Sequence, residues 1–200
     1  MNLTAAEQSL KMEKMAPTPR TKTDTITDEE LERLSNEHSG YRFERVNGEL
    51  QVKSPVKKYS AYLESEYLFH VRKWAEKHGA EVYGSQAGFK LPNGDVRSPD
   101  VSVLLRTHPS YGKKIEEFIS GPPNFLIEIR SHSDSLSSLQ EKMNMWIQNG
   151  CGLAVLIDYK NRTVYTYRPG EPVKKHPYDA TIHCDDILPG FSVCPAAVDR

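Results

Sequence analysis

Apolar residues along the chain fall into runs with two different spacings, and these runs predict the order of strands and helices. Dense apolar runs over Pro99–Leu105, Phe125–Ser131 and Leu153–Ile157 predict buried strands. Apolar positions at helical spacing predict a long helix over Tyr59–His78 and a second helix that follows a serine-rich stretch and ends at about Asn149. The pattern therefore predicts an α/β domain.

Two elements are predicted ahead of this core. Thr27-Asp-Glu-Glu30 has the sequence of a capping box, which predicts a short helix to about Asn36. Asn47-Gly48 lies between two alternating runs and predicts a β-hairpin with a type I′ turn. Residues 1–25 contain few large apolar side chains, so we expect a disordered tail there and one domain over residues 26–200.

The remaining segments complete the predicted sheet. Residues 81–91 predict a strand, residues 106–124 a polar loop, and Thr163–Arg168 the hairpin partner of the buried strand before it. The rest of the chain is polar with short apolar pieces. The predicted architecture is a mixed central β-sheet flanked by helices and preceded by an N-terminal helix and β-hairpin.

Composition narrows the class of protein without naming an activity. Apolar residues make up 38% of the 200 residues and charged residues 26%, which is typical of a soluble globular domain. The net charge of −1 does not favour a nucleic acid as partner. The three cysteines show no C-x-x-C spacing, so we expect a reducing, cytoplasmic location. No apolar run reaches the roughly 18 residues of a spanning helix, and we expect no membrane partner.

Two acids stand out because they lie in segments that should be buried. Glu128 interrupts the apolar run Phe125–Ser131, and Asp100 lies at the start of the strand before it. A buried carboxylate is costly unless a cation or a metal compensates its charge. Strand alternation places Glu128 on the same face as Leu126 and Arg130. The two acids therefore predict a small metal site in the sheet.

The residues around these acids have the chemistry of a metal-dependent phosphodiesterase. Carboxylates on neighbouring strands suit hard divalent cations such as Mg²⁺ or Mn²⁺. A nearby Lys or Arg orients the attacking water and offsets the developing charge, and the candidates are Arg130 and Lys142. Glu66 lies on the apolar stripe of the first long helix, so its carboxylate is also turned inward by the pattern.

Three motifs carry a resemblance to a known family. They are Ser98-Pro-Asp-Val-Ser102, Leu126-Ile-Glu-Ile-Arg-Ser131 and Leu139-Gln-Glu-Lys-Met143. In order and spacing they resemble the Uma-type putative restriction endonucleases of the PD-(D/E)XK nuclease superfamily, over roughly residues 27–192. The resemblance implies a restriction-endonuclease-like core, cleavage of DNA with Mg²⁺ or Mn²⁺ as cofactor, and a possible homodimer.

The resemblance also implies a role for each matching residue. Asp100 and Glu128 are the metal-binding acids of the two superfamily motifs, and Glu66 matches the acid that many members carry on the first core helix. Arg130 stands where the superfamily usually has lysine. Lys142 resembles a lysine relocated to the following helix, so either Arg130 or Lys142 is the expected catalytic cation.

Other interpretations of the same residues stay open. Glu128 can be a structural ion-pair partner of Arg130, Asp100 a turn residue beside proline, and Glu66 or Lys142 an ordinary solvated side chain. At the level of the whole protein, one alternative is a nuclease fold that no longer cuts and serves as a nucleic-acid or protein binding module. Another is a metal-independent structural protein whose acids are only paired.

Overall fold

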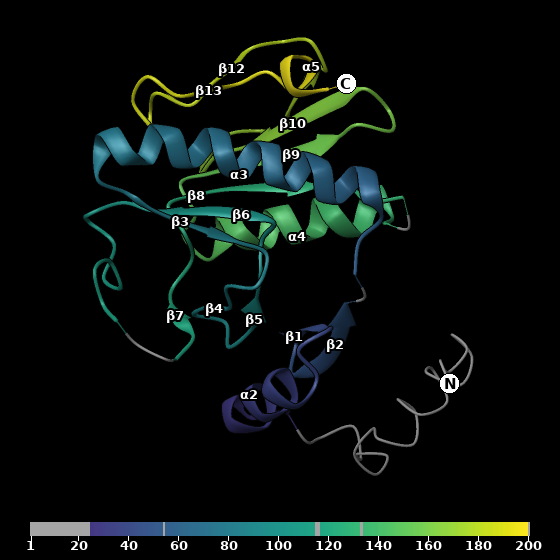
Figure 1. The fold of residues 1–200 in the computed structure, drawn as a ribbon, viewed down its shortest axis with the longest axis vertical. Helices are drawn as coiled ribbons and strands as arrows, with labels where there is room; N and C mark the ends of the chain where they lie inside the picture. Colours follow the sequence, from purple (N-terminus) through teal and green to yellow (C-terminus); the bar gives the residue numbers. More distant parts are fainter. Residues whose placement is uncertain (1–24, 54, 115–116, 133, 200) are drawn as a thin grey trace.

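The computed structural model describes residues 25–53, 55–114, 117–132 and 134–199. The predicted disordered tail, residues 1–25, lies outside the described residues except for its last residue. Two main sheets make up the fold (Figure 1). The sheet that contains the N-terminal hairpin lies at one end, and the C-terminal strands lie at the other. Within the described residues, no helix combines the length and the apolar character needed to cross a membrane.

The predicted N-terminal helix and hairpin are confirmed. Helix α2 spans Asp28–Glu37, and the Thr27 hydroxyl caps it by accepting a hydrogen bond from the Glu30 amide at 3.2 Å. Strands β1 (Arg42–Val46) and β2 (Glu49–Lys53) are antiparallel. Their turn has Asn47 at φ 51° and Gly48 at φ 82°, the two positive values of a type I′ turn.

Three short strands join the hairpin to form a five-stranded sheet in the order β2-β1-β5-β4-β7. They are β4 (Phe89–Lys90), β5 (Val96–Arg97) and β7 (Ile119–Ser120). This sheet and helix α2 form what we call the N-terminal module, whose own small core is built by Ile26, Leu31, Leu34, Phe43 and Val96.

The predicted mixed central sheet is also confirmed, as six strands in the order β11-β10-β9-β8-β6-β3. Strands β8 and β9 are parallel and the other pairs are antiparallel. The strands are β3 (Glu81–Gly84), β6 (Val101–Leu104), β8 (Phe125–Ile129), β9 (Leu153–Asp158), β10 (Thr163–Tyr167) and β11 (Lys174–Pro177).

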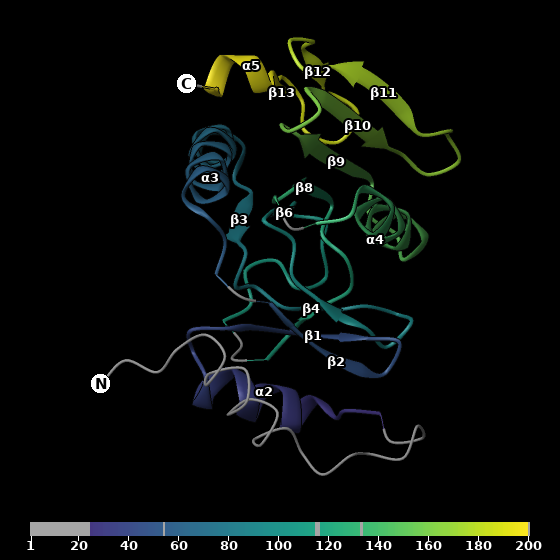
Figure 2. The same ribbon diagram turned by 90° about the vertical axis from the view of Figure 1, so that its right-hand side faces the viewer.

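Helices α3 (Lys58–His78) and α4 (Leu136–Gln148) cover opposite faces of this sheet (Figure 2). The apolar stripe of α3 packs on one face, where Ile127 and Ile129 of β8 point. Met143 and Trp146 of α4 pack on the other face, against Leu126. Because alternate residues of β8 enter different cores, Glu128 is directed toward α4.

The structure differs from the sequence predictions in three segments. The single strand predicted over residues 81–91 is two strands, β3 and β4, in different sheets, because the chain turns where the Ala87 amide donates to the Gly84 carbonyl. The loop predicted over residues 106–124 contains strand β7. The chain after β11 forms β12 (Ile182–His183), β13 (Ser192–Val193) and the short helix α5 (Pro195–Val198).

Candidate active site

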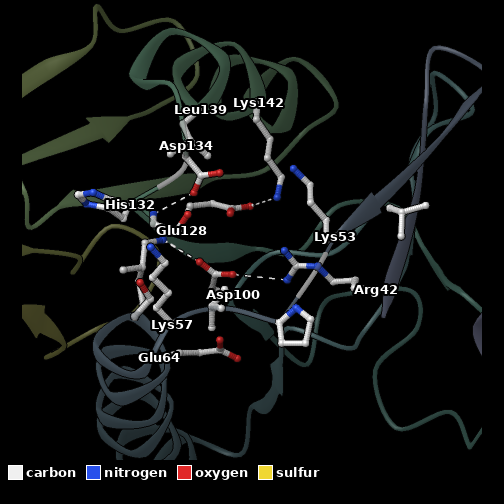
Figure 3. Close-up of a pocket in the computed structure, with 16 residues that line it drawn as sticks. Arg42, Lys53, Lys57, Glu64, Asp100, Glu128, His132, Asp134, Leu139 and Lys142 are labelled. Carbon is white, nitrogen blue, oxygen red and sulfur yellow. Dashed lines mark hydrogen bonds and ion pairs between the residues drawn. The ribbon is translucent and has the colours of Figure 1, made fainter. Parts of the chain in front are cut away.

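A cavity of about 350 Å³ lies where the ends of β6 and β8 meet the start of α3, helix α4 and the hairpin β1–β2. We call it the central cavity; its charged lining includes Asp100, Glu128, Lys142, Arg42 and Glu64. Figure 3 shows these side chains converging from the N-terminal module and from the central sheet with its helices. Of the five predicted site residues, the central cavity contains Asp100, Glu128 and Lys142.

Asp100 lies at a bend just before β6, in the segment that Pro99 begins. Strands β6 and β8 pair with Val101 opposite Ile127, so the register extended by one residue brings Asp100 beside Glu128. One Asp100 carboxylate oxygen accepts a hydrogen bond from the Ile129 amide at 2.8 Å. The other is 3.5 Å from an Arg42 guanidinium nitrogen. The Asp100 carboxylate is therefore oriented from two sides.

Glu128 is the buried acid of strand β8, with 3% of its surface exposed. Its Oε1 is 2.6 Å from the Lys142 ammonium nitrogen and accepts a hydrogen bond from the Trp146 indole at 3.3 Å. Burial, together with the negative charge of Asp100, raises the pKa of Glu128 from 4.5 to about 7, although Lys142 and Arg42 act in the opposite direction. An additional positive charge near Glu128 would therefore favour the ionised form of this carboxyl group.

Lys142 reaches the acids from helix α4 and is 8% exposed. Its ammonium also donates a hydrogen bond to the Ser98 carbonyl at 3.2 Å and is 3.7 Å from the Glu44 carboxylate. Burial opposes the charge of this lysine, but the carboxylates of Glu128 and Glu44 outweigh it and raise the pKa of Lys142 above its usual value. Lys142 is thus a fixed cation at neutral pH.

Arg130 does not join this group. Its guanidinium lies 2.8 Å from the fully buried Asp158 carboxylate and also donates a hydrogen bond to the Asp134 carbonyl. Arg130 follows Glu128 by two residues, just beyond the end of β8, and its guanidinium pairs with Asp158 of the neighbouring strand β9. In this structure the cation beside Glu128 is Lys142.

Helix α3 directs Glu64, and not Glu66, to the central cavity. Both glutamates are half-buried, but among the described residues only Glu64 of the two lines the cavity. Burial and the charge of Asp100 raise the pKa of Glu64, while its hydrogen bonds to Ser85 lower it. Glu64 lies three residues before the buried Tyr67 and seven before the buried Val71, a helical spacing that was available in the sequence.

The hairpin supplies two site residues that the sequence did not reveal, Arg42 and Glu44. Arg42 lines the central cavity beside Asp100. Glu44 is fully buried and is not among the described residues that line the cavity. Phe43, between them, packs in the core of the N-terminal module. The local sequence has the alternation of a half-exposed strand, so nothing in it indicates that the polar face of β1 is covered.

The acids of the central cavity fit a hard divalent cation. Within the described parts of the chain, no three His, Cys, Asp or Glu side chains cluster as metal ligands. Asp100 and Glu128 nevertheless face one cavity from neighbouring strands, and Mg²⁺ commonly binds to one or two carboxylates and keeps several waters. Burial is the main cause of the raised pKa of Glu128, and a cation bound beside this carboxylate would favour its ionised form.

Comparisons with known proteins identify the family and the fold of the chain. The model of the family Uma2, described as putative restriction endonuclease, matches residues 28–198. The crystal structure of a putative nuclease belonging to DUF820 from Anabaena variabilis aligns with a TM-score of 0.69 and 18% identity, over 78% of this chain and 88% of that chain. That likeness shows the same fold.

A second solved structure, the cryoEM structure of a DrdV–DNA complex, aligns with a TM-score of 0.38 and 15% identity, over 56% of this chain and 10% of that chain. A comparison with curated proteins finds no match. The family match covers most of the chain, including both main sheets and every residue of the central cavity. The chain therefore belongs to the Uma2 family of putative restriction endonucleases.

Proposed function

We propose that this protein is a divalent-metal-dependent endonuclease that hydrolyses phosphodiester bonds of DNA. The observation that carries the proposal is the convergence of Asp100, Glu128 and Lys142 in one cavity. Two acids on adjacent strands and a lysine at one of them are the groups that such a reaction needs. DNA as the substrate rests on the family to which the chain belongs.

Basic side chains at the central cavity are available to contact a phosphate-containing substrate. The chain as a whole has a net charge of −1. The cavity lining nevertheless gathers four cationic side chains, from Arg42, Lys53, Lys57 and Lys142. The lining also holds four acidic side chains, from Glu64, Asp100, Glu128 and Asp134, so its charges balance. The basic side chains can contact phosphate oxygens, while the acids would hold the cation.

Asp100 and Glu128 would hold Mg²⁺ or Mn²⁺, together with the carbonyl of Ile129, which also lines the cavity. A cation at this position would lower the pKa of a water molecule and stabilise the charge that develops on the phosphate. The chain itself orients the Asp100 carboxylate through the Ile129 amide and Arg42. This preorganisation avoids an entropic cost when the substrate binds.

Lys142 is the cation that we assign to the reaction. Its ammonium is held at the edge of the central cavity by Glu128 and by the Ser98 carbonyl. From there it orients the attacking water and offsets negative charge on the phosphate. Glu64 is the acid of helix α3 that we assign to the same cavity, where it assists at the metal or at a second one.

The first prediction concerns the two acids. Glu128→Gln and Asp100→Asn keep the size of each side chain but remove its charge, so each variant should cut DNA at least about 100-fold more slowly in Mg²⁺. Cleavage of supercoiled plasmid DNA over time measures the rate. Glu76→Gln, an exposed acid on α3, is the matched control. Wild-type rates in both site variants would show that the assignment is wrong.

The second prediction separates Lys142 from Arg130. Lys142→Met should abolish cleavage without removing metal binding, because the acids remain. Arg130→Met should leave the cleavage rate of the folded protein unchanged. Both substitutions remove the cation that pairs with a buried carboxylate, so each should lower the free energy of unfolding by about 3 kcal/mol. Plasmid cleavage and denaturant unfolding of both variants are the measurements. The opposite pattern, with Arg130 needed for cleavage and Lys142 dispensable, would reverse the assignment.

The third prediction distinguishes the two acids of helix α3. Glu64→Gln should slow cleavage by about 10-fold or more, because it removes a charge from the lining of the central cavity. Glu66→Gln is the matched control and should leave the rate unchanged. If Glu66→Gln is the slower variant, the acid implied by family resemblance is the functional one and Glu64 is not.

The fourth prediction follows from the raised pKa of Glu128. Between pH 4.5 and about 7 the folded protein binds a proton that the unfolded chain has lost, so stability falls as the pH rises through this window. In EDTA, wild type should lose about 3 kcal/mol relative to Glu128→Gln over that range. Urea unfolding at several pH values measures this difference, and a constant difference would contradict it.

A further inference from the structure

Glu44 is a fully buried acid to which the proposed reaction assigns no role. It lies in strand β1, where neighbouring residues face opposite ways. Phe43 packs in the core of the N-terminal module, and Arg45 pairs with Asp28 of helix α2 at 2.8 Å. Alternation therefore turns Glu44 the other way, toward the central sheet.

On that side Glu44 contacts groups that lead directly to the central cavity. Its Oε1 is 3.7 Å from the Lys142 ammonium and 3.4 Å from the Ser98 amide, whose hydrogen it accepts. Arg42 and Arg97 lie 3.7 and 3.4 Å from the same carboxylate. These cations outweigh the effect of burial and keep the pKa of Glu44 below its usual value, so the carboxylate is charged at neutral pH.

The Lys142 ammonium is consequently surrounded by three oxygen groups. They are the Glu128 carboxylate at 2.6 Å, the Ser98 carbonyl at 3.2 Å and the Glu44 carboxylate at 3.7 Å. The first two oxygens lie within hydrogen-bond distance and can use two of the three N–H donors of the ammonium, whereas Glu44 at 3.7 Å attracts it as an ion pair. The Ser98 amide donates to Glu44, and the Ser98 carbonyl accepts from Lys142. Ser98 thus connects Glu44 and Lys142 to the segment that carries Asp100.

Glu44 differs from Glu128 in one respect that matters for the reaction. Glu128 lines the central cavity, whereas Glu44 is not among the described residues that do so. A divalent cation in the cavity would compete with Lys142 for the oxygens of Glu128. Glu44 would still hold Lys142, because it lies behind the lysine and away from the cavity.

We propose that Glu44 is a positioning residue, which holds the Lys142 ammonium and the Ser98 backbone in place for phosphodiester cleavage. This role rests on the nuclease function proposed above. It makes the N-terminal hairpin a part of the active site. The alternative is that Glu44 only docks the hairpin through Arg42 and Arg97, as a buried ion network does.

Glu44→Gln tests the role in cleavage, because it keeps the size of the side chain and removes its charge. We expect kcat for plasmid DNA to fall by about 10- to 100-fold while KM changes little, since Lys142 is displaced but the cavity is intact. Glu44→Asp, which keeps the charge, should recover part of the rate. Glu49→Gln, an exposed acid on the same hairpin, is the control. A lower melting temperature with unchanged kcat would overturn the proposal.

A second measurement does not depend on cleavage. In ¹⁵N-edited NMR spectra the buried, hydrogen-bonded Lys142 ammonium should give a resolved signal, assigned by its loss in Lys142→Met. We expect Glu44→Gln to abolish or broaden it and Glu49→Gln to preserve it. A wild-type protein that cuts no DNA would refute the nuclease function. The NMR signal would still show whether Glu44 holds the Lys142 ammonium in place. An unchanged signal in Glu44→Gln would overturn the proposal. If Glu44→Gln fails to fold, a folded Glu44→Asp that keeps the wild-type signal and the full rate would overturn it instead, because its shorter side chain withdraws the carboxylate from Lys142.

Discussion

The ion pair between Glu128 and Lys142 is the interaction on which the candidate site depends. A central strand must be buried on both faces, and an isolated carboxylate there would cost several kcal/mol. Lys142 at 2.6 Å and the Trp146 indole at 3.3 Å reduce that cost. Both partners come from helix α4. The acid in strand β8 is therefore tolerated only because α4 packs on this face of the sheet.

The same arrangement explains why the site needs the N-terminal module as well as the central sheet. Helix α4 places Lys142 beside Glu128, but the far side of the ammonium faces the hairpin β1–β2. Strand β1 is buried on both faces, with Phe43 in one core and Glu44 against the central sheet. The N-terminal module thereby closes the charged interior of the site, and Arg42 from the same strand contacts Asp100.

The parts of the fold and of the candidate site that depend on one local sequence pattern could be predicted. The hairpin followed from Asn47-Gly48, and the direction of Glu128 followed from strand alternation in an apolar run. The choice of Glu64 over Glu66 could also have been made from helical spacing, because Glu64 lies three residues before Tyr67 and seven before Val71, both buried. Tertiary pairing decides the rest. Glu44 has the sequence of a solvent-facing strand residue, and only the packing of the two sheets buries it.

The central claim is that Asp100 and Glu128 form a divalent-cation site, and direct metal binding tests it most simply. Isothermal titration calorimetry with Mn²⁺ should show one saturable site in wild type at about pH 7.5, where Glu128 is largely ionised. Binding should be lost in Asp100→Asn and in Glu128→Gln, and should persist in Glu76→Gln. Absence of binding in wild type, or equal binding in all four proteins, would contradict the account.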